Sequence, residues 1–147
     1  MAHKFRAAGS LLLGKLSLHQ FAYGPTGENA DYGHMHNPWN PEMVTGGSSG
    51  GSGSAAAAGQ CTITTGSDTG GSIRFPSAAC GIVGLQPTWG RVSRHGVLVL
   101  AEPFAHLGPM TRCAADAGII LQTLARLDPT DPPTLSAPVP PMFAARH

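Results

Sequence analysis

Two glycine- and serine-rich blocks dominate the middle of the sequence, Gly46-Gly47-Ser48-Ser49-Gly50-Gly51-Ser52 and Gly66-Ser67-Asp68-Thr69-Gly70-Gly71-Ser72. Between them, the small residues 55–58 predict a helix, and the β-branched run at residues 61–65 predicts a buried strand. A strand that leads into a Gly-Gly-Ser turn and then a helix presents the serine hydroxyl at a sharp bend. The same turn points several backbone N–H groups into one small volume, where they can stabilise an oxyanion. The two blocks therefore predict an α/β fold with serine-based chemistry.

The composition is that of one globular domain rather than of a nucleic-acid or membrane protein. The chain has 147 residues, of which 41% are hydrophobic and 12% charged, and its formal net charge is +1. A dedicated nucleic-acid binder would show a clustered basic excess, and no apolar run approaches the ~18–20 residues of a membrane span. The apolar run at residues 11–13 is too short for the core of a secretory signal. We therefore expect a cytoplasmic protein that binds neither nucleic acid nor membrane.

Neither disulfides nor metal sites are indicated by the sequence. The three cysteines, Cys61, Cys80 and Cys113, are widely spaced and form no C-x-x-C motif. His34 and His36 make a His-x-His pair with no third ligand placed nearby, which favours a loop over a metal centre. The sequence therefore predicts no metal and no cofactor, and Cys80 is expected to be a small buried residue.

Outside the two blocks, local patterns predict short elements joined by irregular segments. We expect the end of a helix and then a short strand near residues 11–13, irregular chain over residues 22–45, and a helix after Ser72 that ends at Pro76 or Gly81. Thr111 is expected to cap a helix over residues 112–127. The apolar face of that helix would comprise Ile120, Leu121, Leu124 and Leu127. The alternation of strands and helices predicts three or four short strands with partly parallel pairing. Residues 129–141 contain six prolines, which excludes regular structure there.

The turn at the end of the second block supplies the candidate chemical groups. Ser48 and Ser72 both lie in glycine-dense turns, and the oxyanion donors would be backbone amides of the turn that ends in Ser72. Arg74 follows Asp68 by six residues, so we expect an ion pair that braces the turn. The glycines are also compatible with three other structures: a flexible Gly/Ser linker, a phosphate-binding loop, which lacks the required Gly-Lys-Ser/Thr ending, and a nucleophile elbow at Ser48, which lacks a good preceding strand.

Further blocks extend the pattern, and together they closely resemble the amidase signature family. These blocks are Phe21-Ala22-Tyr23-Gly24, Asn37-Pro38-Trp39, Cys80-Gly81-Ile82-Val83-Gly84-Leu85-Gln86-Pro87-Thr88, Gly90-Arg91-Val92-Ser93 and Gly108-Pro109-Met110-Thr111-Arg112. The likeness covers nearly the whole chain. It implies a mixed β-sheet flanked by helices, of which residues 1–128 would form a part with an incomplete sheet, followed by a Pro-rich tail over residues 129–147.

The resemblance also implies hydrolysis of a small-molecule amide by a Ser-cis-Ser-Lys relay. Ser72 matches the nucleophile that forms an acyl-enzyme, and Ser48 matches the bridging serine, which follows a cis peptide bond in the family. The remaining implied site residues are Thr69, Gly70 and Gly71 for the oxyanion hole, and Asp68, Arg74 and Ser49 for structural support.

The catalytic lysine of the family has no match here, because the only lysines are Lys4 and Lys15. His19, His95 and His106 are candidates to replace that base, but sequence spacing does not show which of them lies near the serines.

The alternative hypothesis is a catalytically inactive or weakly esterase-like remnant that acts as an oligomer or beside a partner chain. A homo-oligomer would cover the open edges of an incomplete sheet. Within the family, a subunit that releases ammonia for transamidation on transfer RNA is a further interpretation, although the charge balance predicts no basic surface for it.

Overall fold

The computed structural model describes residues 1–142 and contains a three-stranded sheet. Its strands are β1 (Ile63–Asp68), β2 (Val83–Gly84) and β3 (His106–Thr111), in the order β1-β3-β2. Both neighbouring pairs are antiparallel, and the register runs from Ile63 opposite Thr111 to Asp68 opposite His106. The α/β class is confirmed. The expected parallel pairing is wrong because β3 lies between β1 and β2, which run in the same direction without touching.

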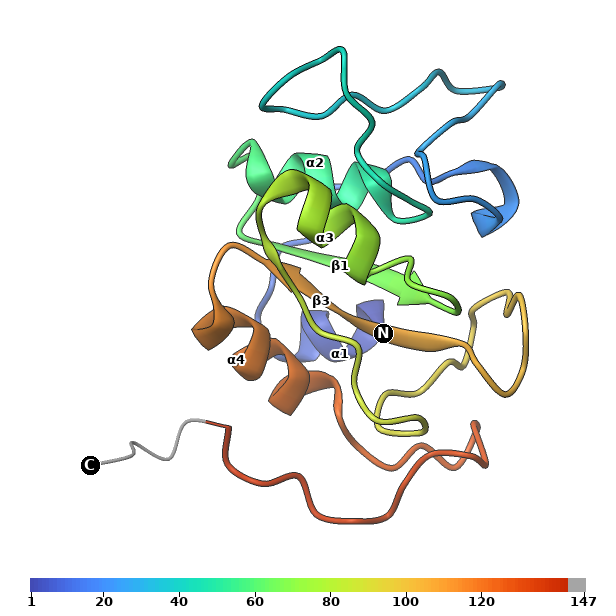
Figure 1. The fold of residues 1–147 in the computed structure, drawn as a ribbon. Coiled ribbons are helices and arrows are strands. Elements are labelled where there is room, and N and C mark those ends of the chain that lie inside the picture. The colour runs from blue at the N-terminus through green and yellow to red at the C-terminus, as the bar shows by residue number, and fades with distance from the viewer. Residues whose placement is uncertain (143–147) are drawn as a thin grey trace.

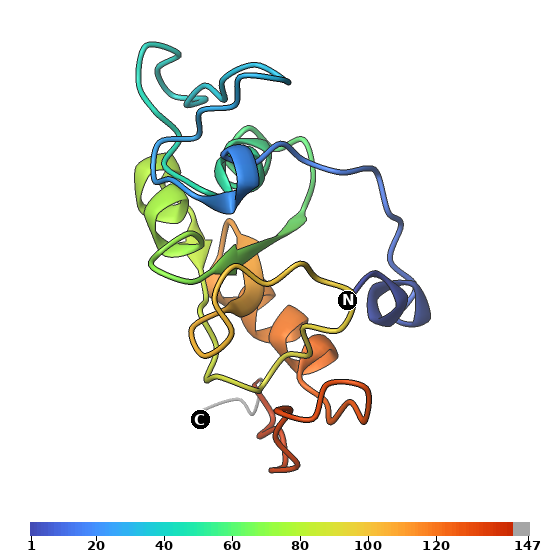
Figure 2. The ribbon, with the colours of Figure 1, turned by 90° about the vertical axis from the view of Figure 1, so that its right-hand side faces the viewer.

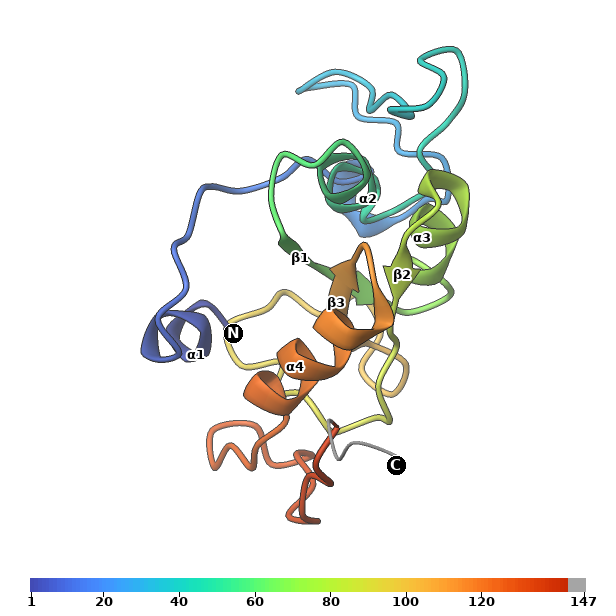
Figure 3. The same ribbon diagram turned by 90° about the vertical axis from the view of Figure 1, so that its left-hand side faces the viewer.

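Helices cover both faces of the sheet. The helices are α1 (Ala2–Ala7), η1 (Gln20–Ala22), α2 (Gly50–Ala57), α3 (Arg74–Cys80) and α4 (Ala114–Leu124). Helices α2 and α3 pack on one face, and α4 packs on the other with α1 beside it (Figures 1 and 3). The main apolar cluster lies on the α4 side and contains Val92, Leu107, Ile120, Leu121, Leu124 and Ala125. On the opposite face, the small residues of α2 let the helix approach β1 closely, and the buried side chain of Met110 lies beside Gly66.

The N-terminal segment differs from the sequence prediction. The helical part is confirmed as α1, but residues 11–13 form no strand, and the side chains of Leu11, Leu12 and Leu13 are exposed. The chain from α1 to η1 runs outside the sheet (Figure 2), and it is paired with none of the three strands of the described residues. The irregular segment over residues 22–45 is confirmed, apart from a single bridge between His36 and Val44.

The C-terminal half contains a strand that the sequence patterns did not predict. Gly108 and Pro109 are strong breakers of regular structure, but in β3 Pro109 accepts a hydrogen bond from Leu85 N at 3.0 Å. Thr111 is consequently the last residue of β3 rather than a helix cap, and α4 begins after Cys113. The predicted helix was too long at its end as well, since Leu127 is exposed beyond α4.

Residues 129–142 hold no helix or strand, as predicted. They are tied to the rest of the chain, because Leu135 N donates to Gly90 O and Asp131 accepts from Arg94 N. The boundary at residue 128 stays a prediction, and residues 143–147 of the expected tail lie outside the described residues. None of the helices in residues 1–142 is long and apolar enough to cross a membrane.

Candidate active site

The two glycine-rich blocks meet where α2 and α3 begin. Ser49 N donates a hydrogen bond to Ser72 O at 3.2 Å, and Ser67 N donates to Ser49 Oγ at 3.2 Å. These contacts fix the turn before α2 against the turn after β1. Ser48 is 1% exposed, and the peptide bond from Gly47 to Ser48 is cis, as the resemblance implies. Ser48 and Ser72 line the same cavity.

A glycine in β1 makes this close approach possible. A Cβ atom at Gly66 would lie 2.7 Å from Ser49 Oγ and 2.8 Å from Met110 Sδ. Any larger residue would therefore push the start of α2 away from the strand. The absence of a side chain at Gly66 thus lets Ser49 lie against β1, while the backbone N–H of Ser49 donates to Ser72 O.

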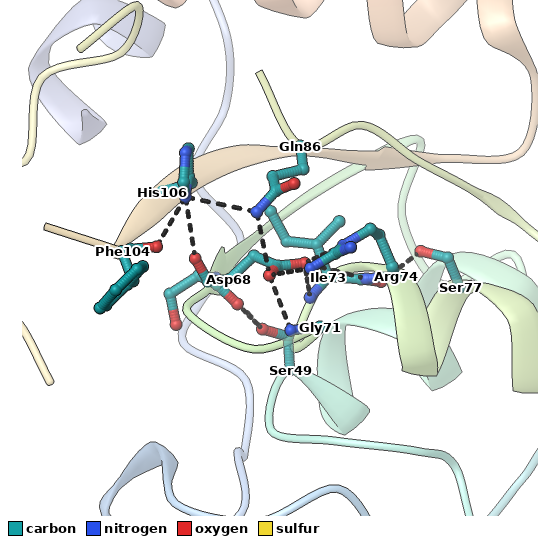
Figure 4. A network of polar contacts seen from close by, with 10 residues as sticks. Ser49, Asp68, Gly71, Ile73, Arg74, Ser77, Gln86, Phe104 and His106 are labelled. Atoms are coloured by element: carbon teal, nitrogen blue, oxygen red, sulfur yellow. Dashed lines mark hydrogen bonds and ion pairs between the residues drawn. The ribbon is translucent and has the colours of Figure 1, made fainter. Parts of the chain in front are cut away.

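Asp68 organises the turn that carries Ser72 (Figure 4). Its carboxylate is fully buried and accepts hydrogen bonds from the backbone N–H groups of Gly71 at 2.8 Å and Ile73 at 3.1 Å. Arg74 donates to it through Nε and Nη2, each at 3.0 Å, so the expected ion pair is confirmed. Gln86 Nε2 also donates to it at 3.3 Å.

The ionisation of Asp68 reflects two opposing effects. Burial raises the pKa of this carboxyl group, but the donors of Arg74 and the backbone N–H groups of Ile73 and Arg74 lower it more. The net result is a pKa below the usual value of an aspartate. Asp68 is therefore an anion at neutral pH, and it holds the turn rather than transferring protons.

The backbone amides of the turn fall into two groups. Those of Gly71, Ile73 and Arg74 point toward Asp68 and donate to its carboxylate. Within the described residues, no hydrogen bond to another residue is donated by the amides of Thr69, Gly70 and Ser72. These amides have no acceptor in the described chain, whereas the amide of Gly71 already has one.

The cavity brings together residues that the sequence patterns left unconnected. Its polar lining consists of Ser48, Ser67, Thr69, Ser72, Arg94 and His106. Of the three histidines considered as bases, His106 is the one that lines it, and its Nδ1 lies 2.7 Å from Phe104 O. A carbonyl oxygen only accepts, so a hydrogen bond at this contact requires a proton on Nδ1. The sequence patterns did not indicate Arg94 as a site residue, because a lone arginine in a Ser-Arg-His sequence carries no recognisable signal.

Neither lysine lines this cavity. Lys4 Nζ donates to Leu124 O at 2.8 Å at the junction of α1 and α4, and Lys15 lies beside a separate shallow hollow with Gln20 and Tyr32. Away from the site, Cys80 is buried as predicted, and burial raises the pKa of its thiol. His36 Nδ1 lies 2.9 Å from Pro41 O, within the irregular loop.

Comparison with known proteins identifies the family of this arrangement. A sequence model described as "Amidase" matches residues 1–147. A glutamyl-tRNA(Gln) amidotransferase subunit from Synechococcus sp. (strain WH7803) is 52% identical over 139 residues, which cover 95% of this chain and 28% of that protein. The crystal structure of the corresponding subunit from Thermotoga maritima matches with a TM-score of 0.92 and 40% identity, over 94% of this chain and 30% of that one. Native peptide amidase from Stenotrophomonas maltophilia matches with a TM-score of 0.90 and 37% identity, over 97% of this chain and 30% of that one. The chain therefore spans about 28% of the length of the curated relatives it matches.

Proposed function

The chain belongs to the amidase family, and on that premise we propose that it carries the nucleophile and the bridging serine of an amide hydrolase. The observation that carries the proposal is the joint position of Ser48 and Ser72 on one cavity, which Thr69 of the turn also lines. The hydrogen bond from Ser49 N to Ser72 O at 3.2 Å supports it, because this bond fixes the spacing of the two turns.

In the proposed reaction, Ser72 Oγ attacks the carbonyl carbon of the amide. Its proton passes to Ser48 Oγ, which hands its own proton to a base. The free amides of Thr69 and Gly70 stabilise the negative oxygen of the tetrahedral intermediate, an effect of about 3–4 kcal/mol per donor in other hydrolases. The C–N bond then breaks as the leaving nitrogen takes the proton back from the relay. Water hydrolyses the acyl ester, which releases the acid and regenerates Ser72.

Neither lysine of this chain is assigned as the base that accepts the proton from Ser48, because both lie away from the cavity. His106 borders the cavity, and in the tautomer that donates from Nδ1 to Phe104 O its Nε2 carries the lone pair that can take the proton from Ser48. Even without an efficient base, oxyanion stabilisation and binding alone support residual hydrolysis of activated substrates in serine hydrolases.

The test is covalent labelling of the chain with an ethyl fluorophosphonate, followed by peptide mass spectrometry. We expect one adduct, on Ser72, which is lost in Ser72→Ala and slowed in Ser48→Ala. Ser136→Ala is the matched control, because Ser136 is exposed and lies outside the cavity. Absence of an adduct on Ser72 in the folded wild-type chain would refute the proposed function.

The second candidate is a non-catalytic fragment that binds a partner chain. The exposed side chains of Leu11, Leu12 and Leu13 favour it, because consecutive exposed leucines are typical of contact surfaces. The name of the Synechococcus relative also makes that protein one component of an amidotransferase. Size-exclusion chromatography with light scattering discriminates the candidates when combined with labelling. A labelled monomer supports the hydrolase, and an unlabelled oligomer supports the fragment.

A further inference from the structure

The cavity at Ser72 has an apolar wall as well as its polar lining. The wall is formed by Val97, Leu98, Val99, Leu100, Ala105 and Leu107. The first four belong to an irregular loop, and the side chain of Leu98 is 100% exposed while Val97 and Leu100 are also exposed. Exposed leucine and valine side chains beside a nucleophile offer an apolar surface that an acyl chain can remove from water.

One buried arginine holds this loop in place. Arg94 Nη1 donates to Glu102 O and to Glu102 Oε2, each at 2.6 Å, which joins the two ends of the loop. On its other side, Arg94 N donates to Asp131 Oδ2 at 2.7 Å, and the guanidinium lies 5.3 Å from the centroid of the Trp89 ring. The wall is therefore fixed by tertiary contacts, although it contains no helix or strand.

The charges around the cavity are already paired. Arg94 lies between Glu102 and Asp131, with N–O distances of 2.6 Å and 3.7 Å. Within residues 1–142, no Asp or Glu lines the cavity, and the nearby carboxylate of Asp68 is occupied by Arg74. An acyl group with an ammonium ion would thus meet no counter-ion from these residues and would face the apolar loop instead.

We propose that the acyl side of the substrate is apolar and uncharged, and that it packs on the loop formed by residues 97–100. This inference rests on the proposed role of Ser72 and adds the substrate class to it. The proposed substrate class differs from that of a hydrolase that acts on the side chain of a free amino acid, because the charged groups of a free amino acid need polar partners.

The experiment compares three fluorophosphonates that differ in the group on phosphorus: ethyl, butyl and 4-ammoniobutyl. In each labelling step the Ser72 Oγ–P bond forms, the P–F bond breaks, and fluoride and the hydroxyl proton leave to water. Full burial of a methylene group corresponds to a gain of about fourfold in rate, so butyl should label several-fold faster than ethyl, up to about 15-fold. The ammoniobutyl probe should label no faster than ethyl.

Two variants locate the preference. Leu98→Ser should reduce the butyl-to-ethyl rate ratio several-fold, whereas Leu127→Ser, which changes an exposed leucine outside the cavity, should leave the ratio unchanged. Circular dichroism confirms that both variants fold. If Ser72 is labelled but the butyl probe has no advantage, or the ammoniobutyl probe is the fastest, the apolar class is wrong and the nucleophile stands. If no probe labels Ser72, the proposed function fails, and the substrate class fails with it.

Discussion

Two neighbouring glycines in the turn before Ser72 should respond very differently to the same substitution. A Cβ atom at Gly71 would lie 2.5 Å from Cε2 of Phe75, and the φ angle of Gly71 is +133°. A Cβ atom at Gly70 would meet nothing within 4 Å, and its φ angle lies outside the positive range. We therefore expect Gly71→Ala to damage the fold and Gly70→Ala to be tolerated.

The magnitudes follow from the two environments. At Gly71, the backbone conformation costs an alanine about 1–3 kcal/mol, and the close contact adds about 1 kcal/mol, at the low end because the ring of Phe75 is half exposed and can move. At Gly70, alanine restricts the unfolded chain and stabilises the protein by about 0.4–1 kcal/mol. The free energies of unfolding of the two variants should thus differ by about 2–5 kcal/mol.

Urea denaturation followed by circular dichroism measures this difference, and the labelling rate of Ser72 gives a second readout. Gly71→Ala should lower both the unfolding free energy and the labelling rate. Gly70→Ala should leave the fold intact and the unfolding free energy undiminished. Any loss of labelling in that variant therefore reports on access to the proposed oxyanion donors. Unfolding free energies within about 1 kcal/mol of each other would refute the geometric reasoning about this turn.

Two further predictions concern the supports of the turn. Asp68→Asn should lower the free energy of unfolding by about 3 kcal/mol at pH 7, because one amide group cannot accept hydrogen bonds from Gly71, Ile73 and Arg74 together. The control variant Glu42→Gln, at an exposed position, should change this free energy little. The donors hold the pKa of Asp68 below its unfolded value of about 4, so this stabilisation is present above about pH 4 and is lost as the pH falls. The urea midpoint should therefore drop less between pH 7 and pH 3 in Asp68→Asn than in the wild type. Gly66→Ala should cost about 1–3 kcal/mol by overpacking against the start of α2, and an unchanged urea midpoint would contradict that role.

The parts of the fold with local signals could be predicted from the sequence. The small residues at 55–58 indicate the end of α2, which begins earlier, at Gly50 in the glycine-rich block. The β-branched run at residues 61–65 overlaps the first half of β1, and α3 ends before Gly81 as expected. The ion pair between Asp68 and Arg74 was also predictable, since six residues span one tight turn and the start of a helix. In each case the residues that decide the element are close together in the chain.

The parts decided by distant residues could not be predicted in this way. Strand β3 contains Gly108 and Pro109, and it forms because its two neighbours supply hydrogen-bond partners and cover. The proximity of His106 to the serines depends on that strand, so spacing alone could not distinguish it from His19 or His95. The same holds for Arg94, whose partners at Glu102 and Asp131 are known only from the folded chain.

The buried carboxylate of Asp68 accounts for the need for glycine at position 71 of the turn before Ser72. Its oxygens draw the amides of Gly71 and Ile73 inward, and this curvature forces the positive φ angle at Gly71. The same curvature leaves the amides of Thr69 and Gly70 without protein acceptors in the described chain. In a turn of this shape, the buried anion occupies some of the donors, and the amide of Thr69, which lines the cavity, is left without an acceptor in the described chain. On this argument, the proposed oxyanion hole depends on Asp68 for its shape, and Gly71 contributes through its backbone conformation rather than through its N–H group.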